Sequence, residues 1–118
     1  MSNFEADFPL EETVVELSNG AKVVVRESTA YDTEVVTEMM ADSKLKEDNL
    51  TVEFNLCAIC MVKMITKDKD GNEVEKAFPK VKSLDDIRRR KLIKSQDWIK
   101  IFEAYMQLNG YNKETLGK

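Results

Sequence analysis

The pattern of apolar and polar positions begins with two short β-branched segments joined by a turn. Residues 13–17 and 21–26 are rich in valine, and Ser18-Asn19-Gly20 lies between them. An Asn-Gly pair between such segments is among the strongest short-range signals for a β-hairpin. Because a two-stranded ribbon alone is only marginally stable, we expect this hairpin to pack against helices.

The middle of the chain has helical spacing. Ser28 or Thr29 can cap a helix whose apolar positions include Val36 and Met40. Residues 50–65 are almost continuously apolar and contain few turn-forming residues. Such a run is typical of a helix that is buried on most sides, so we expect this segment to be a helix at the centre of the core.

Capping residues predict two further helices toward the C-terminus. The charged segment 42–49 ends the preceding helix and supplies the cap of the central one. Ser83 is followed three residues later by Asp86, a variant of the capping box. Ser95 caps the last helix, and Asn109-Gly110 provides its stop.

A second, weaker hairpin is expected where residues 63–66 and 74–78 flank the Asp70-Gly71 turn. The complete pattern predicts a mostly α member of the α+β class, with an N-terminal β-hairpin packed on a bundle of four to five helices. The 118 residues fit one domain, in which residues 1–9 and 111–118 are expected to be flexible.

Composition narrows the classes of partner. Hydrophobic residues make up 42% of the chain and charged residues 34%, as in ordinary globular domains. The net charge of -4 argues against nucleic acid as the main partner, because phosphate binding requires a surplus of Lys and Arg. The start resembles no secretory signal and no apolar run is long enough to span a bilayer, so a cytosolic protein without membrane contact is expected.

Cys57 and Cys60 form the one motif with a chemical character. A redox pair needs a stabilised thiolate, whereas these thiols lie in an apolar segment that raises the thiol pKa. A zinc site needs four ligands, and the chain has two cysteines and no histidine. We therefore interpret the pair as two small core residues, and metal shared across a symmetric dimer is the remaining alternative.

Other kinds of metal, catalytic or phosphate-binding site are excluded because the chain lacks the required residue types or their spacing. The segment around Asp68 and Asp70 resembles a calcium loop, but its first and twelfth positions would be Thr66 and Ala77, which supply no carboxylate. Triads that depend on histidine are excluded, and no glycine-rich phosphate loop occurs. The sequence predicts no enzyme, no catalytic residue, no cofactor and no metal.

The sharpest charge feature is the run Arg88-Arg89-Arg90-Lys91. Seven basic residues and two acidic ones lie between Lys80 and Lys94. The run can be a solvated helix face near a helix C-terminus, or a docking patch for an acidic partner segment. The acidic N-terminus of a neighbouring copy would also fit and would give a homo-oligomer, while nucleic acid ranks third.

An aromatic stripe marks the last helix. Trp98, Phe102 and Tyr105 recur at helical spacing and can form either core or an exposed groove, with core favoured because a small domain needs its only Trp inside. The candidate partner-binding residues are therefore Arg88, Arg89, Lys91, Trp98, Phe102 and Tyr105.

Two motifs carry a resemblance to a known family. The first is Val15-Glu-Leu-Ser-Asn-Gly-Ala-Lys-Val-Val-Val-Arg-Glu27, and the second is Asp97-Trp-Ile-Lys-Ile-Phe-Glu-Ala-Tyr-Met-Gln-Leu-Asn-Gly110. With the helical middle between them, the chain resembles tail assembly chaperones of tailed bacteriophages, and a similar layout occurs in baseplate assembly proteins.

The resemblance implies a non-enzymatic role in the host cytoplasm. A tail assembly chaperone binds the tape measure protein, a long helical chain whose apolar stripe would otherwise aggregate, and it helps to recruit tail tube subunits. The alternative that the resemblance leaves open is a structural baseplate or tail-completion component that is retained in the virion.

Overall fold

The N-terminal hairpin forms as predicted. The structure is a computed structural model that describes residues 9–41 and 49–110. Strands β1 (Glu12–Glu16) and β2 (Lys22–Arg26) pair antiparallel, with Glu12 opposite Arg26 and Glu16 opposite Lys22. Gly20 has a φ of 86° in the connecting turn, which explains why glycine follows Asn19 there.

The predicted mostly α fold with a two-stranded hairpin is wrong, because the sheet has four strands. Strand β3 (Met61–Lys67) pairs with β2, and β4 (Glu73–Ala77) pairs with β3, so the antiparallel order is β1-β2-β3-β4. The sheet is therefore a core element of a compact α+β domain rather than an attachment to a helical bundle. The weaker hairpin around Asp70-Gly71 is confirmed as β3 and β4.

The error lies in residues 50–65, which form a helix and then a strand. Helix α3 (Asn49–Ile59) ends one residue before β3 begins, and Cys60 is the only residue between them. Apolar content alone does not separate a buried helix from a buried strand, and no Gly or Pro marks the change.

The other helices follow the capping signals except at α5. Helix α2 (Ala30–Ala41) is capped by Thr29, whose hydroxyl accepts a hydrogen bond from the Asp32 backbone N–H at 3.2 Å. Helix α4 (Leu84–Arg90) is capped by Ser83 as predicted. Helix α5 (Ser95–Leu108) begins at Ser95 itself, with Lys94 in the capping position and no side-chain cap, so the predicted Ser95 cap is wrong.

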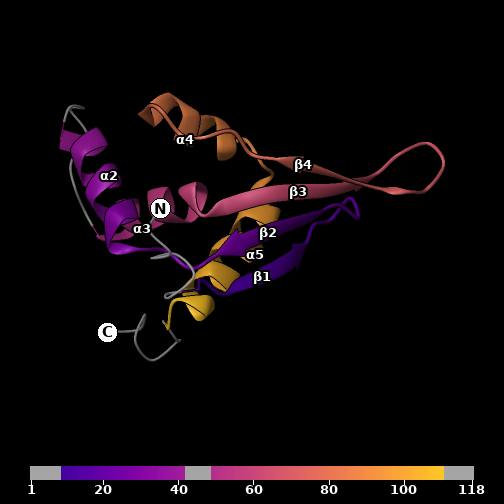
Figure 1. The fold of residues 1–118 in the computed structure, drawn as a ribbon, viewed down its shortest axis with the longest axis horizontal. Helices are drawn as coiled ribbons and strands as arrows, with labels where there is room; N and C mark the ends of the chain where they lie inside the picture. The colour runs from indigo at the N-terminus through magenta and orange to yellow at the C-terminus, as the bar shows by residue number, and fades with distance from the viewer. Residues whose placement is uncertain (1–8, 42–48, 111–118) are drawn as a thin grey trace, which may run out of the picture.

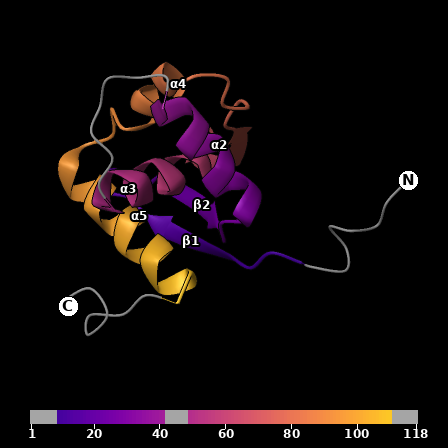
Figure 2. The same ribbon diagram turned by 90° about the vertical axis from the view of Figure 1, so that its left-hand side faces the viewer.

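Helices cover one face and one end of the sheet (Figure 1). Helix α5 packs along β1 and β2, while α3 lies between α2 and α5 at the end of the sheet, as the turned view also shows (Figure 2). The sheet and the helices both contribute fully buried residues to the core between them. These residues include Val23, Val25, Val36, Cys57, Ile101 and Tyr105.

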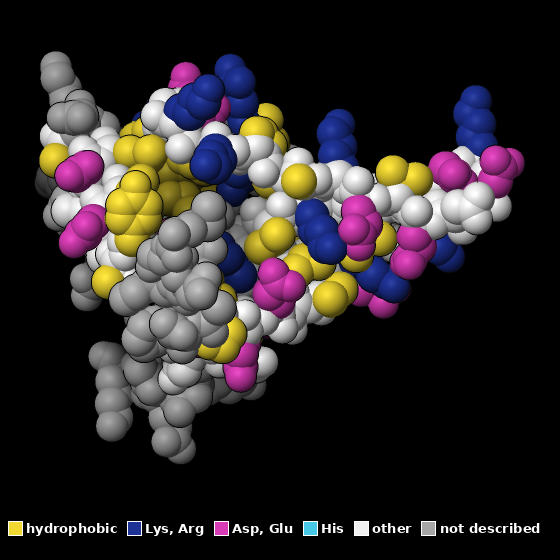
Figure 3. Space-filling model, viewed as in Figure 1, with side chains coloured by type: hydrophobic (Ala, Val, Ile, Leu, Met, Phe, Trp, Pro, Cys, Tyr) yellow, Lys and Arg dark blue, Asp and Glu magenta, His cyan; other side chains and the backbone are white. Residues whose placement is uncertain are grey.

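Much of the opposite face of the sheet is exposed and carries both charged and apolar side chains (Figure 3). Ion pairs join neighbouring or next-neighbouring strands there, Lys63 to Glu75 at 3.1 Å and Lys22 to Glu73 at 3.7 Å. The β3–β4 hairpin extends beyond the helices, and every residue of β4 is exposed. Helical cover thus reaches only part of the sheet.

Several predictions fall outside the described residues. They are the flexible ends at 1–8 and 111–118 and the helix boundary within 42–48, whereas Pro9 is described and exposed. Within residues 9–41 and 49–110, none of the helices combines the length and the apolar character needed to cross a bilayer.

Candidate protein-binding surface

The basic run of α4 divides between the surface and the interior. Arg88 and Arg89 are exposed, whereas Arg90 is buried and Lys91 is half-buried. Helix geometry explains the division, because residues separated by one position point about 100° apart. The four cations are adjacent in the sequence, but they therefore have different surroundings in the fold.

Arg90 is a structural residue that caps α3. Its Nη1 donates to the carbonyl oxygens of Ala58 at 2.8 Å and Ile59 at 3.2 Å, and its Nη2 donates to the carbonyl of Pro79. The guanidinium carbon lies 5.3 Å from the centre of the Phe78 ring. Burial lowers the pKa of Arg90, but the carbonyl oxygens and the ring compensate for lost water.

Lys91 points toward α3. Its ammonium group donates to the side-chain carbonyl of Asn55 and lies 5.8 Å from the centre of the Phe54 ring. Burial lowers the pKa of Lys91. The candidate Lys91 is thus placed beside an aromatic side chain of α3 rather than beside the exposed arginines.

Phe54 joins two of the predicted stripe residues in an aromatic cluster between α3 and α5. The Phe54 ring lies 4.5 Å from Phe102 in an edge-to-face arrangement and 6.3 Å from Trp98. All three rings are half-buried. We name Phe54, Lys91, Trp98 and Phe102 the aromatic surface. Sequence reasoning missed Phe54, because it lies within the continuous apolar run where nothing distinguishes it.

Tyr105, the third stripe residue, belongs to the core. It is fully buried, and its hydroxyl lies 3.4 Å from Oε2 of Glu53. Burial raises the pKa of Tyr105. The preference for core over groove therefore holds for Tyr105, while Trp98 and Phe102 pack against the core and keep part of their area at the surface.

The exposed arginines adjoin an apolar side chain. Leu92 follows α4 and is 84% exposed, the highest value among the large apolar residues described as exposed. Arg88 makes a 3.8 Å ion pair with the exposed Asp85, a contact worth little in water. We name Arg88, Arg89 and Leu92 the basic corner. Lys91, which belongs to the aromatic surface, stands between Arg89 and Leu92 in the chain but points away from them toward α3.

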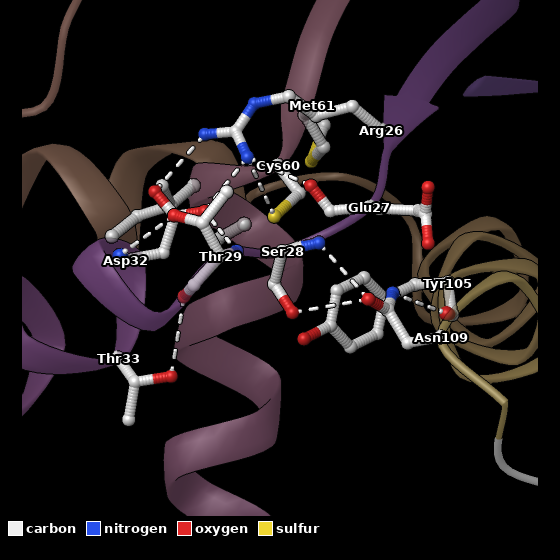
Figure 4. Close-up of polar contacts among 12 residues, drawn as sticks. Arg26, Glu27, Ser28, Thr29, Asp32, Thr33, Cys60, Met61, Tyr105 and Asn109 are labelled. Carbon is white, nitrogen blue, oxygen red and sulfur yellow. Dashed lines mark hydrogen bonds and ion pairs between the residues drawn. The ribbon is translucent and has the colours of Figure 1, made fainter. Parts of the chain in front are cut away.

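Cys57 and Cys60 are free and fully buried, as interpreted from the sequence. Burial raises the pKa of both thiols, that of Cys60 to about 12. The guanidinium of Arg26 lies 3.6 Å from the Cys60 sulfur but does not offset burial (Figure 4). These thiols fit a packing role.

Native Cys57 and Cys60 are expected to resist alkylation. Iodoacetamide at about pH 8 reacts with thiolate, and both thiols are protonated and shielded from solvent. Intact mass after an hour should show the unmodified chain, whereas the same reagent in guanidinium chloride should add two groups. Rapid double labelling of the folded protein would contradict the burial.

A polar junction beside Cys60 joins three segments of the fold (Figure 4). Arg26 forms a bidentate pair with Asp32, at 2.7 and 3.1 Å, and also donates to the carbonyl of Glu27. Close by, the side-chain oxygen of Asn109 accepts bonds from the N–H and hydroxyl of Ser28. This network holds the β2–α2 connection and the end of α5 in place. Its contacts are therefore accounted for by a structural role.

In the Asp68–Asn72 turn, the Asp68 side chain also bonds to the backbone of its own turn. The Asp68 carboxylate accepts bonds from the N–H groups of Asp70 and Asn72, each at 2.9 Å. Over the described ranges, no group of three or more His, Cys, Asp or Glu side chains could hold a metal ion. Among the described residues, the aromatic surface and the basic corner are therefore the candidate binding surfaces.

Comparison of the chain with protein-family models, with curated proteins and with solved structures finds no match.

Proposed function

We propose that this chain is a phage tail assembly chaperone that binds the tape measure protein in the host cytoplasm and helps to recruit tail tube subunits. Of the two sequence motifs that carry the resemblance, the first contains the end of β1 and all of β2, and the second covers most of α5. These elements pack on each other, so the motifs describe one structural unit. The proposal makes the protein a binding partner without chemistry of its own.

The observation that carries the proposal is the aromatic surface. Phe54, Trp98 and Phe102 lie between two helices and stay half-buried, with the Lys91 ammonium at their border. Aromatic side chains in such positions contribute a large share of the energy in protein interfaces. A helix with an apolar stripe, the feature ascribed to the tape measure protein, is the kind of partner that docks between helices.

The edges of the sheet are less suited to a partner. Glu12 and Glu16 lie on edge strand β1, and Glu73 and Glu75 lie on edge strand β4, all of them exposed. Charged side chains on edge strands oppose the addition of another strand. This favours the helical side of the molecule as the binding side.

Co-expression with the tape measure protein encoded beside this chain tests the proposal. The tape measure protein should be soluble only when it is co-expressed with this chain, and the two proteins should co-purify in stoichiometric amounts. Trp98→Ser and Lys91→Glu should each reduce its recovery by about tenfold or more, since an interface anchor is worth about 2 kcal/mol. Val74→Ser is the matched control, because Val74 is exposed on β4, away from the aromatic surface.

Two results would overturn this function. One is a tape measure protein that is soluble alone, or insoluble whether or not this chain is present. The other is the presence of this chain in purified virions by mass spectrometry, which would indicate a structural baseplate or tail-completion component. Circular dichroism and thermal unfolding of each variant keep a folding defect separate from lost binding.

A further inference from the structure

The aromatic surface has a cation at its border. Lys91 lies directly after α4, and its ammonium group donates a hydrogen bond to the side-chain carbonyl of Asn55 on α3. The same ammonium lies 5.8 Å from the centre of the Phe54 ring. Helices α3 and α5, which carry the three rings, lie side by side (Figure 2). The two contacts of Lys91 therefore hold a positive charge beside the rings.

A purely apolar helix that docked on the rings would bury this charge further. Lys91 is half-buried in the chain itself, so part of its surface is still in contact with water. Removing that water without supplying a hydrogen-bond acceptor costs free energy, because a charged group is strongly solvated. Burial in the fold already lowers the pKa of Lys91, which is a sign of this cost. A partner that covers the rings therefore binds more tightly if it brings a negative charge to Lys91.

We propose that the aromatic surface selects an acidic amphipathic helix, whose apolar stripe covers the three rings and whose carboxylate pairs with Lys91. This inference rests on the proposed function, because it specifies the partner segment that the same surface binds. An ammonium group has three N–H donors and Asn55 accepts from one of them, so a carboxylate can accept from another. Lys91 is thus a specificity-determining residue of the surface.

The spacing on the surface suits side chains along one helix. Residues three or four positions apart on a helix have Cβ atoms about 5–6 Å apart. The centre of the Phe54 ring lies 5.8 Å from the Lys91 ammonium and 4.5 Å from the centre of the Phe102 ring. An apolar residue over Phe54 and an acidic residue three or four positions away can therefore meet the ring and the ammonium at the same time.

Synthetic helices test the charge preference directly. Three designed peptides share one leucine stripe, contain no tryptophan, and carry Glu, Gln or Lys at the positions that flank the stripe. Trp98 is the only tryptophan of the chain and belongs to the aromatic surface, so the shift of its fluorescence emission measures binding there. The wild-type chain should bind the Glu peptide about tenfold more tightly than the Gln peptide, and the Lys peptide least. The preference for Glu should weaken as salt is raised.

Substitutions of Lys91 assign the preference to one residue. Lys91→Met keeps an unbranched side chain without the charge, so it should bind the Gln peptide like wild type and lose the preference for Glu. Lys91→Glu should reverse the order of the three peptides, and Lys91→Arg should keep it. Lys69→Glu is the matched control, because it makes the same change of charge at the exposed turn between β3 and β4 and should leave the order unchanged.

The net charge of -4 would by itself favour the Lys peptide, so a preference for Glu reports the local charge at the surface. Equal binding of the Glu and Gln peptides by the wild-type chain would overturn the inference, and so would binding of none of the three. A preference for Glu that survives in Lys91→Met would also overturn it, and would assign the selection to the basic corner.

These results are separate from the test of the proposed function, because the peptides are designed and not taken from the tape measure protein. Co-purification of the tape measure protein without a charge preference for the peptides would contradict this inference alone. A charge preference without co-purification would contradict the phage function alone, and would leave an acidic helix of another protein as the partner.

Discussion

Replacing Arg90 by methionine is expected to lower the free energy of unfolding by about 3 kcal/mol, because it leaves buried carbonyl groups without donors. The last four carbonyls of α3 have a complete set of partners. The backbone N–H of Cys60 donates to the carbonyl oxygens of Leu56 and Cys57, at 3.0 and 3.1 Å. The guanidinium of Arg90 donates to the carbonyl oxygens of Ala58 and Ile59. Methionine retains the packing volume but donates nothing.

Urea unfolding followed by circular dichroism measures this effect. The matched controls are Arg88→Met and Arg89→Met, which alter neighbouring exposed residues and should shift the free energy of unfolding by no more than about 0.5 kcal/mol. Arg90→Lys should fall between the two, because one ammonium cannot reach several carbonyls at once. Equal losses at positions 88, 89 and 90 would contradict the capping role.

The same arginine explains which part of the fold the sequence could predict. The β1–β2 hairpin depends on Asn19-Gly20 and its adjacent valines, which are all local, and it forms as expected. At the change from α3 to β3, the carbonyls of Ala58 and Ile59 accept hydrogen bonds from Arg90, thirty residues after Cys60 in the chain. No local pattern contains that information. The helix in this apolar run ends where the guanidinium of a residue distant in the chain donates to the carbonyls of Ala58 and Ile59.

The candidate surface was predictable to a similar extent. The composition of the run 88–91 indicates a basic surface, but which cations face outward depends on how α4 is rotated against α3. Arg90 was not among the candidate residues, and Lys91 was, although both contact α3. Phe54 becomes recognisable only when α5 brings Trp98 and Phe102 beside it. Chain periodicity identifies the helices, and their packing decides which side remains available.

Asp32→Ala is expected to destabilise the domain by about 3 kcal/mol, since it leaves a partly buried guanidinium unpaired and removes a helix cap. The Asp32 carboxylate accepts two bonds from Arg26 and one from the Thr29 N–H at 2.8 Å. With the bond from its own N–H to the Thr29 hydroxyl, this completes a reciprocal capping box at the start of α2.

A double-mutant cycle separates the ion pair from the cap. Arg26→Met removes the cation, and in that background the loss caused by Asp32→Ala should shrink to the capping contribution of about 1 kcal/mol. Thermal or urea unfolding of the four proteins gives the coupling free energy. Strictly additive losses would show that Arg26 and Asp32 do not stabilise each other.

The pH dependence of the same pair has a definite sign. Burial raises the pKa of Asp32, but hydrogen bonds from Arg26 and Thr29 outweigh it, so the pKa in the folded state lies below the ordinary value of 3.8. A carboxyl with a lowered folded pKa contributes stability that is fully present well above the unfolded value and is lost as pH falls through the folded value.

Asp32→Asn isolates that contribution from those of Asp86 and Asp97, whose pKa values are also lowered, by backbone hydrogen bonds from Lys82 and Ser18 respectively. All three carboxyls protonate on acidification in the wild type, but only Asp32 differs between the two proteins. The difference in free energy of unfolding between wild type and Asp32→Asn should therefore be greatest near neutral pH and diminish as pH falls below 3.8. Urea titrations at a series of pH values measure it. A difference that stays constant or grows in acid would show that the carboxylate charge of Asp32 does not stabilise the junction.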